Sequence, residues 1–110
     1  MFKIVPNPSF EAQVAITRLG EAKPGLITFT FKNLGHRELQ AWVASSKDAA
    51  NDAVWLGQVI EGWAGPVGAD DQPLPYSEAA LVALFDAFPA ASQEVYEGYL
   101  KARRESRSGN

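Results

Sequence analysis

Cysteine is absent from this 110-residue chain, and long apolar runs are missing as well. Without cysteine the protein can form neither disulfides nor thiolate metal sites, a composition that suits a reducing cytoplasm. No segment approaches the roughly 18 apolar residues of a membrane-spanning helix. The first residues contain no apolar run of signal-peptide length. We therefore expect a protein that is made and used in the cytoplasm and has no membrane partner.

Residues that usually carry catalysis or bind metals are also scarce. His36 is the single histidine, and no serine stands at a spacing that would pair it with His36 for nucleophilic catalysis. Asp48 and Asp52 share a face of a predicted helix, and Asp70 and Asp71 lie in a predicted loop, but neither pair has the spacing of a calcium loop. The sequence therefore predicts no catalytic residue, no metal and no cofactor.

The charge of the chain is moderately acidic and unevenly distributed. The formal net charge is −3, although residues 101–110 carry +3, so that the remaining body carries −6. An acidic body argues against nucleic acid as a partner. The basic end contains Arg103 and Arg104, and it can be a solvated helix end that complements the helix dipole or a docking element for a partner.

Length and composition fit one folded domain over residues 1–110. Apolar residues make up 46% and aromatic residues 11% of the chain, as in folded rather than disordered proteins. Residues 1–9 contain two prolines and are expected to form an extended lead-in. The polar residues 105–110 are expected to fray.

Two segments with alternating apolar and polar residues predict a β-hairpin over residues 10–32. The strands are expected at residues 10–19 and 26–32, joined by a turn that contains glycine and proline. In the second strand Ile27, Phe29 and Phe31 should face inward. A lone hairpin is only marginally stable, so other elements must cover its apolar face.

The apolar period changes to that of helices after Lys32, and residues 36–104 are expected to be helical. We expect helices at 36–46, at 49–61 with a cap near residues 46–48, from Ser77 to the residues before Pro89, and from Ser92 onward. The predicted fold is thus α+β, with an N-terminal β-hairpin packed on a bundle of three to four helices.

Aromatic residues near a long loop are candidates for contact with a partner. The loop covers residues 64–75, and long loops are often functional. Trp63 and Tyr76 border this loop, and Trp55 falls beside the main apolar stripe of the second predicted helix. Tryptophan and tyrosine are favoured at binding hot spots. Each can also fill the core: Trp63 stands on the apolar stripe, whereas Trp55 and Tyr76 fit either role.

The order of these features resembles the tail assembly chaperones of long-tailed bacteriophages. Gly62-Trp63 is followed by an acidic loop with prolines, which ends in Pro75-Tyr76-Ser77. The N-terminal half is also similar, with Arg18-Leu19-Gly20-Glu21 between two alternating segments. Further matching positions are Leu81, Leu84, Phe85, Pro89, Val95 and Tyr99. Gln72 departs from the small residue usual in the loop, and the Leu-rich helix is short.

The resemblance implies a function. Such a protein binds the tape measure protein, keeps its apolar helical surface soluble, and helps to recruit tail tube protein subunits. It acts in the cytoplasm of the host bacterium and is not part of the mature virion. Homo-oligomers are possible. The residues expected to contact partners are Trp55, Trp63, Tyr76, Arg103 and Arg104.

Two other functions remain open at this point. A small cytoplasmic adaptor or binding module of a system unrelated to phage tails has the same general composition. A small enzyme that depends on backbone groups is the third possibility. Neighbouring genes that encode a tail tube protein and a tape measure protein would favour the chaperone.

Overall fold

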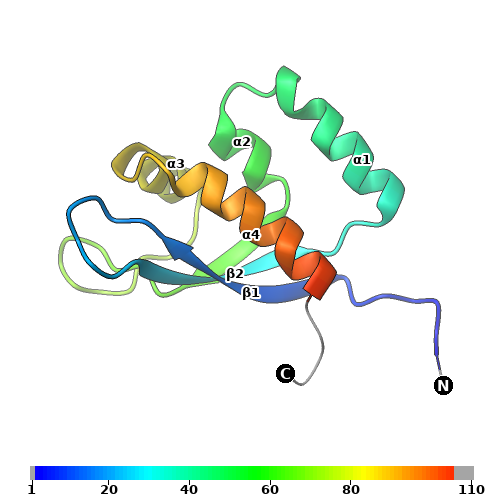
Figure 1. Ribbon diagram of the computed structural model, residues 1–110, viewed down its shortest axis with the longest axis horizontal. Coiled ribbons are helices and arrows are strands. Elements are labelled where there is room, and N and C mark those ends of the chain that lie inside the picture. The colour runs from blue at the N-terminus through cyan, green and yellow to red at the C-terminus, as the bar shows by residue number, and fades with distance from the viewer. Residues whose placement is uncertain (1, 106–110) are drawn as a thin grey trace.

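Four α-helices lie on one face of a three-stranded antiparallel sheet in the computed structural model, which describes residues 2–105 (Figure 1). The predicted α+β class is confirmed. The elements are β1 (Ser9–Ile16), β2 (Gly25–Lys32), α1 (His36–Ala44), the 3-10 helix η1 (Ser45–Asp48), α2 (Asp52–Gly57), β3 (Ile60–Ala64), α3 (Glu78–Ala87) and α4 (Ala91–Glu105). The end predicted to fray lies, apart from Glu105, outside the described residues.

The strands β1 and β2 form the predicted hairpin, with Phe10 opposite Phe31 and Val14 opposite Ile27. The inward positions of both strands are the buried ones, as the alternation predicts. Strand β1 ends at Ile16, earlier than expected. The reason is that the next residue, Thr17, donates its backbone N–H and its hydroxyl to the carboxylate of Glu94. This contact ties the end of β1 to the first turn of α4.

Residues 60–64 form a strand, and our expectation of a helix up to residue 61 was wrong. Helix α2 ends at Gly57, and β3 then pairs with the free side of β2, with Trp63 opposite Phe29 and Ile60 opposite Phe31. The apolar spacing that we assigned to one helical stripe is instead divided between a short helix and a strand. Backbone groups at the edge of β2 need partners, and short apolar runs do not distinguish a strand from a helix.

The connection between α1 and α2 also differs from the sequence prediction. Residues 45–48 form η1, and α2 is capped by Asn51, whose side-chain oxygen accepts a hydrogen bond from the backbone N–H of Val54 at 2.9 Å. Asp48 and Asp52 therefore lie in separate elements and not on one helix face.

The predicted cap of α3 is confirmed: the Ser77 hydroxyl accepts a hydrogen bond from the backbone N–H of Ala80 at 3.0 Å, and α3 ends before Pro89.

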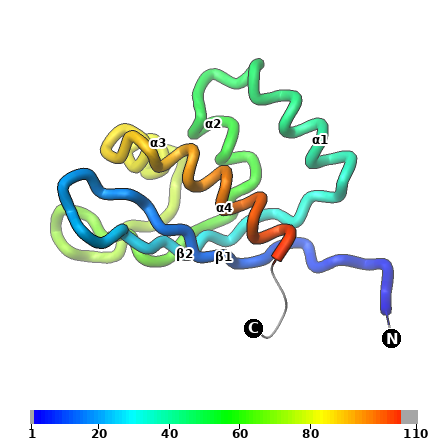
Figure 2. The backbone as a smooth tube through the Cα atoms, in the orientation of Figure 1, coloured from blue at the N-terminus to red at the C-terminus, as the bar shows by residue number. Residues whose placement is uncertain are grey.

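The core lies between the sheet and the helices, and Tyr99 of α4 is at its centre. Its ring packs against Phe31 and Trp42, and its hydroxyl donates to the Lys32 carbonyl at 2.9 Å. The backbone tube in Figure 2 shows α4 running across the sheet, while the segment before β1 leaves the body of the molecule. The fully or nearly fully buried side chains are Val14, Ile16, Ile27, Phe29, Phe31, Trp42, Ala53, Leu56, Val59, Ile60, Leu81, Ala91, Val95 and Tyr99.

Candidate partner-binding surface

Trp55 is paired with Trp42 across α1 and α2. The two rings are stacked with centroids 4.1 Å apart, and each indole N–H donates to the backbone carbonyl of the other residue. Trp42 is buried, whereas Trp55 is half-buried. Trp55 is therefore part of the helix packing and also presents part of its ring to the surface.

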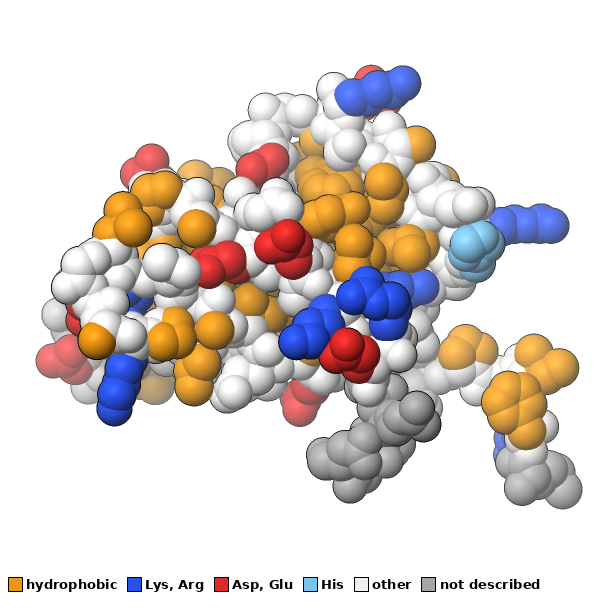
Figure 3. Space-filling model, in the orientation of Figure 1, with side chains coloured by type: hydrophobic (Ala, Val, Ile, Leu, Met, Phe, Trp, Pro, Cys, Tyr) orange, Lys and Arg blue, Asp and Glu red, His pale blue; other side chains and the backbone are white. Residues whose placement is uncertain are grey.

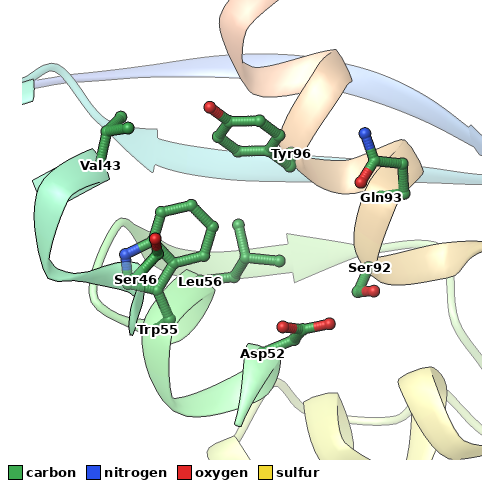
Figure 4. A pocket seen from close by; sticks show the side chains of 8 residues that line it. All are labelled: Val43, Ser46, Asp52, Trp55, Leu56, Ser92, Gln93 and Tyr96. Carbon is green, nitrogen blue, oxygen red and sulfur yellow. The ribbon is translucent and has the colours of Figure 1, made fainter. Parts of the chain in front are cut away.

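A pocket of about 220 Å³ opens beside Trp55 (Figure 4). Side chains of α2 face those of α4 across it, and the end of α1 closes one side. Trp55 and Tyr96 supply the aromatic walls, with ring centroids 5.3 Å apart. Asp52 is the charged residue among those that line the pocket. The lining residues are Val43, Ser46, Asp52, Trp55, Leu56, Ser92, Gln93 and Tyr96.

Trp63 and Tyr76, the residues at the two borders of the loop, lie together in the structure. Their rings make an edge-to-face contact at 5.2 Å, and Trp63 also packs edge-on against Phe29. The indole N–H of Trp63 donates to the Leu74 carbonyl at 2.8 Å. Both rings are half-buried. Trp63 thus belongs to β3 and not to a helix, and it anchors the loop to the sheet.

The loop between them has its own hydrogen bonds. Residues 67 and 73 form an antiparallel bridge, and the N–H of Leu74 donates to the Pro66 carbonyl at 3.0 Å. At the tip, Asp71 adopts a positive φ of 62°, and the Asp70 carboxylate accepts from the backbone N–H of Gln72. Asp70 and Asp71 therefore form the turn of a small hairpin that keeps the Trp63–Tyr76 surface in place.

The two arginines proposed as partner contacts have different environments. Arg103 is half-buried, donates to the Leu34 carbonyl at 2.8 Å, and lies 5.7 Å from the centre of the Tyr99 ring. Arg104 is exposed. Arg103 thus fixes the end of α4 to the chain after β2, and Arg104 is the arginine of this pair that can meet a partner without loss of an internal contact.

Two tyrosines have perturbed acidity. Burial raises the pKa of Tyr76, and the nearby Glu78 carboxylate raises this pKa further. Burial also raises the pKa of Tyr99, although Arg103 partly opposes this increase. Both hydroxyls are therefore protonated at neutral pH and can act as hydrogen-bond donors.

Exposed apolar side chains supplement these sites. In Figure 3, apolar side chains are visible in the region between α1 and α4, and also along the segment that precedes β1. Leu74 in the loop is 37% exposed and Val82 on α3 is 45% exposed. Such side chains offer contact area to a partner protein.

The described residues contain no group of three or more His, Asp and Glu side chains that could hold a metal ion. None of the helices in residues 2–105 combines the length and hydropathy that are needed to cross a bilayer. His36 is exposed at the first position of α1.

Sequence reasoning did not find the pocket beside Trp55. Tyr96 was placed on the apolar face of the last helix, but the convergence of Val43, Asp52 and Tyr96 depends on how α1, α2 and α4 pack. The sequence contains one partial signal, the position of Trp55 beside the main apolar stripe.

Comparison with known proteins identifies one family. The model of a family described as phage tail assembly chaperone matches residues 1–110, which is the whole chain. The comparisons with curated proteins and with solved structures gave no match.

Proposed function

Because the chain belongs to the phage tail assembly chaperone family, we propose that it binds the tape measure protein of its phage and keeps that protein soluble. The family match over the whole chain carries this proposal. We further propose that the protein helps to recruit tail tube subunits, acts in the cytoplasm of the host bacterium, and is absent from the mature virion.

The surface formed by Trp63, Leu74 and Tyr76 is our candidate for contact with the tape measure protein. Its two aromatic rings are half-buried and supported by hydrogen-bonded backbone, so they lose little side-chain entropy on binding. Partial exposure limits the area that each contact can bury. Weak contacts repeated along one partner give tight overall binding while leaving each copy displaceable by tube subunits.

Arg104 is our candidate for a second, electrostatic contact. It lies on the last turn of α4, is exposed, and belongs to residues 101–110, which carry a formal charge of +3. The remainder of the protein is acidic, so this end can attract an acidic surface on a different subunit. Trp55 and Arg103 remain candidates in the same proposal, with the restriction that both also stabilise the fold.

Co-expression with the tape measure protein of the same phage tests the proposal. The wild-type protein should raise the soluble yield of the tape measure protein and co-purify with it. Leu74→Ser should reduce this yield, because it makes the proposed surface more polar while the backbone carbonyl of residue 74 still accepts from Trp63. Val82→Ser is the matched control, an exposed apolar position on α3.

The possible results test the proposed function and the proposed surface separately. If the wild-type protein neither co-purifies with the tape measure protein nor raises its solubility, the proposed function is wrong. If Val82→Ser reduces the yield as much as Leu74→Ser, the function stands but the assigned surface is wrong. Thermal melts of each variant show whether the domain is still folded.

A further inference from the structure

An extended arm of apolar residues precedes the sheet. Residues 2–8 lack helix and strand structure, and the side chains of Phe2, Ile4 and Val5 are 89%, 90% and 78% exposed. The root of the arm is fixed, because Asn33 donates its backbone N–H to the Pro8 carbonyl and its side-chain amide to the Asn7 carbonyl. Three large apolar side chains on one projecting segment are unusual for an isolated soluble domain.

The pocket beside Trp55 is complementary to this arm in apolar character, in size and in charge. Two aromatic side chains and Val43 form apolar walls, and Asp52 is the charged residue among those that line it. Its volume of about 220 Å³ lies below the roughly 300–1,000 Å³ of small-molecule sites. The pocket is therefore sized for one or two side chains. In the arm, Lys3 is the charged residue among residues 2–8.

The arm does not fill the pocket of its own chain. The pocket is lined by residues from the first turns of α4, whereas Tyr99 and Arg103, further along the helix, bond to the carbonyls of Lys32 and Leu34 beside the root of the arm. From Ser92 to Arg103 the helix rises about 16 Å. The arm also points away from the helices (Figure 1).

We propose that the arm of one copy inserts into the pocket beside Trp55 of a second copy. In this contact Phe2 packs against the exposed parts of Trp55 and Tyr96 at the pocket, and Lys3 approaches Asp52. Arm and pocket are different surfaces, so the contact is heterologous, and its repetition from copy to copy builds a chain wherever the rotation between neighbours does not close a ring. The role of this contact rests on the proposed function. Chains of this kind would place many copies along one tape measure protein.

Charge reversal tests the pairing directly. Sedimentation velocity from 5 to 200 µM should show assembly of the wild-type protein that increases with concentration. Lys3→Glu and Asp52→Lys should each weaken assembly about fivefold or more, because each places like charges in the contact. An equimolar mixture of the two variants should assemble again, since the arm of each then matches the pocket of the other.

Glu78→Lys is the matched control. Like Asp52, Glu78 is the first residue of its helix, but it lines a different pocket, between α2, β3 and α3. This variant should assemble within twofold of the wild-type protein. Phe2→Ser should weaken assembly without any change in charge. Circular dichroism establishes that every variant is folded.

Three results would overturn the inference. One is a wild-type protein that stays monomeric up to 200 µM. Another is a mixture of Lys3→Glu and Asp52→Lys that assembles no better than either variant alone. The third is assembly that needs the arm but is insensitive to Asp52→Lys, which would place the arm elsewhere, for example on the free edge of β1. The tape measure co-expression assay is independent: its failure with an assembling protein refutes the proposed function and leaves the arm–pocket contact intact.

Discussion

Trp42 and Trp55 donate their indole N–H groups to each other's backbone carbonyls, at 3.0 and 2.8 Å, while their rings stack. The pair thus buries a large apolar area and satisfies both polar groups of the indoles. Because the two residues belong to α1 and α2, the pair determines how these helices pack. It also positions one wall of the pocket beside Trp55.

Trp55→Ala should therefore lower the free energy of unfolding by about 3 kcal/mol or more, in the range of large-to-small changes at buried aromatic residues. Trp55→Phe keeps a ring and should cost about half as much. Urea unfolding followed by far-UV circular dichroism measures both. A loss below 1 kcal/mol for Trp55→Ala would show that the residue does not hold the two helices together.

Gly98 of α4 lies directly over β1. A Cβ atom at this position would be 2.9 Å from Cγ2 of Val14, which is itself buried and has a stiff side chain. Gly98→Ala should destabilise the protein by about 1–3 kcal/mol, although alanine is the better helix former.

Gly57→Ala is the control for this change, because a Cβ there would make only ordinary contacts of 3.7 and 3.9 Å. The double variant Gly98→Ala with Val14→Ala should be more stable than the sum of the two single losses implies. Strict additivity in thermal or urea melts would contradict the close approach of α4 to β1.

Tyr99→Phe should cost about 1 kcal/mol at pH 8, since it removes the hydrogen bond to the Lys32 carbonyl. Burial raises the pKa of Tyr99 above its ordinary value near 10. Below about pH 10 the hydroxyl is protonated in both the folded and the unfolded chain, so its contribution is fully present. Above this pH the unfolded chain loses the proton first, and the stability of the wild-type protein falls.

The advantage of the wild-type protein over Tyr99→Phe should accordingly shrink as the pH rises above about 10. Urea melts of both proteins at several pH values give this difference, in which the contributions of the ionisable groups that the two proteins share cancel. A difference that stays constant or grows with pH would disagree with a buried tyrosine hydroxyl at this position.

Arg103→Ala and Arg104→Ala form a matched pair of neighbouring charge deletions. Arg103→Ala should destabilise the fold by about 1–2 kcal/mol, because it removes the bond to the Leu34 carbonyl and the contact with Tyr99. Arg104→Ala should change stability by less than about 0.5 kcal/mol. Chemical unfolding of both variants measures the two losses of free energy. Equal losses would show that the contacts of Arg103 do not stabilise the fold.

The sequence was sufficient for the parts of the fold that depend on local pattern. The alternation in residues 26–32 predicts the buried faces of Phe29 and Phe31, and Ser77 and Pro89 mark the limits of α3. These features depend on side-chain period and on capping chemistry, both of which act over a few residues.

Features that depend on tertiary packing could not be predicted in this way. Whether Ile60 and Trp63 continue a helix or form a strand depends on a free edge of β2 that lies nearly thirty residues earlier in the chain. The pairing of Trp42 with Trp55, and the position of Arg103 over Tyr99, also require elements that are distant in sequence to meet. Among the candidate site residues, Trp63 and Tyr76 were predicted to border one loop, and their contact is visible only in the structure.

The central position of β2 has a consequence for the synthesis of the protein. One edge of β2 pairs with β1 at once, but its other edge waits for β3, which ends 32 residues after the end of β2. At about 5–20 residues per second, translation leaves that edge without its partner for roughly 2 to 6 s. During this interval an unpaired strand with Phe29 and Phe31 is a template for aggregation. This member of the phage tail assembly chaperone family thus passes through a brief aggregation-prone stage of its own.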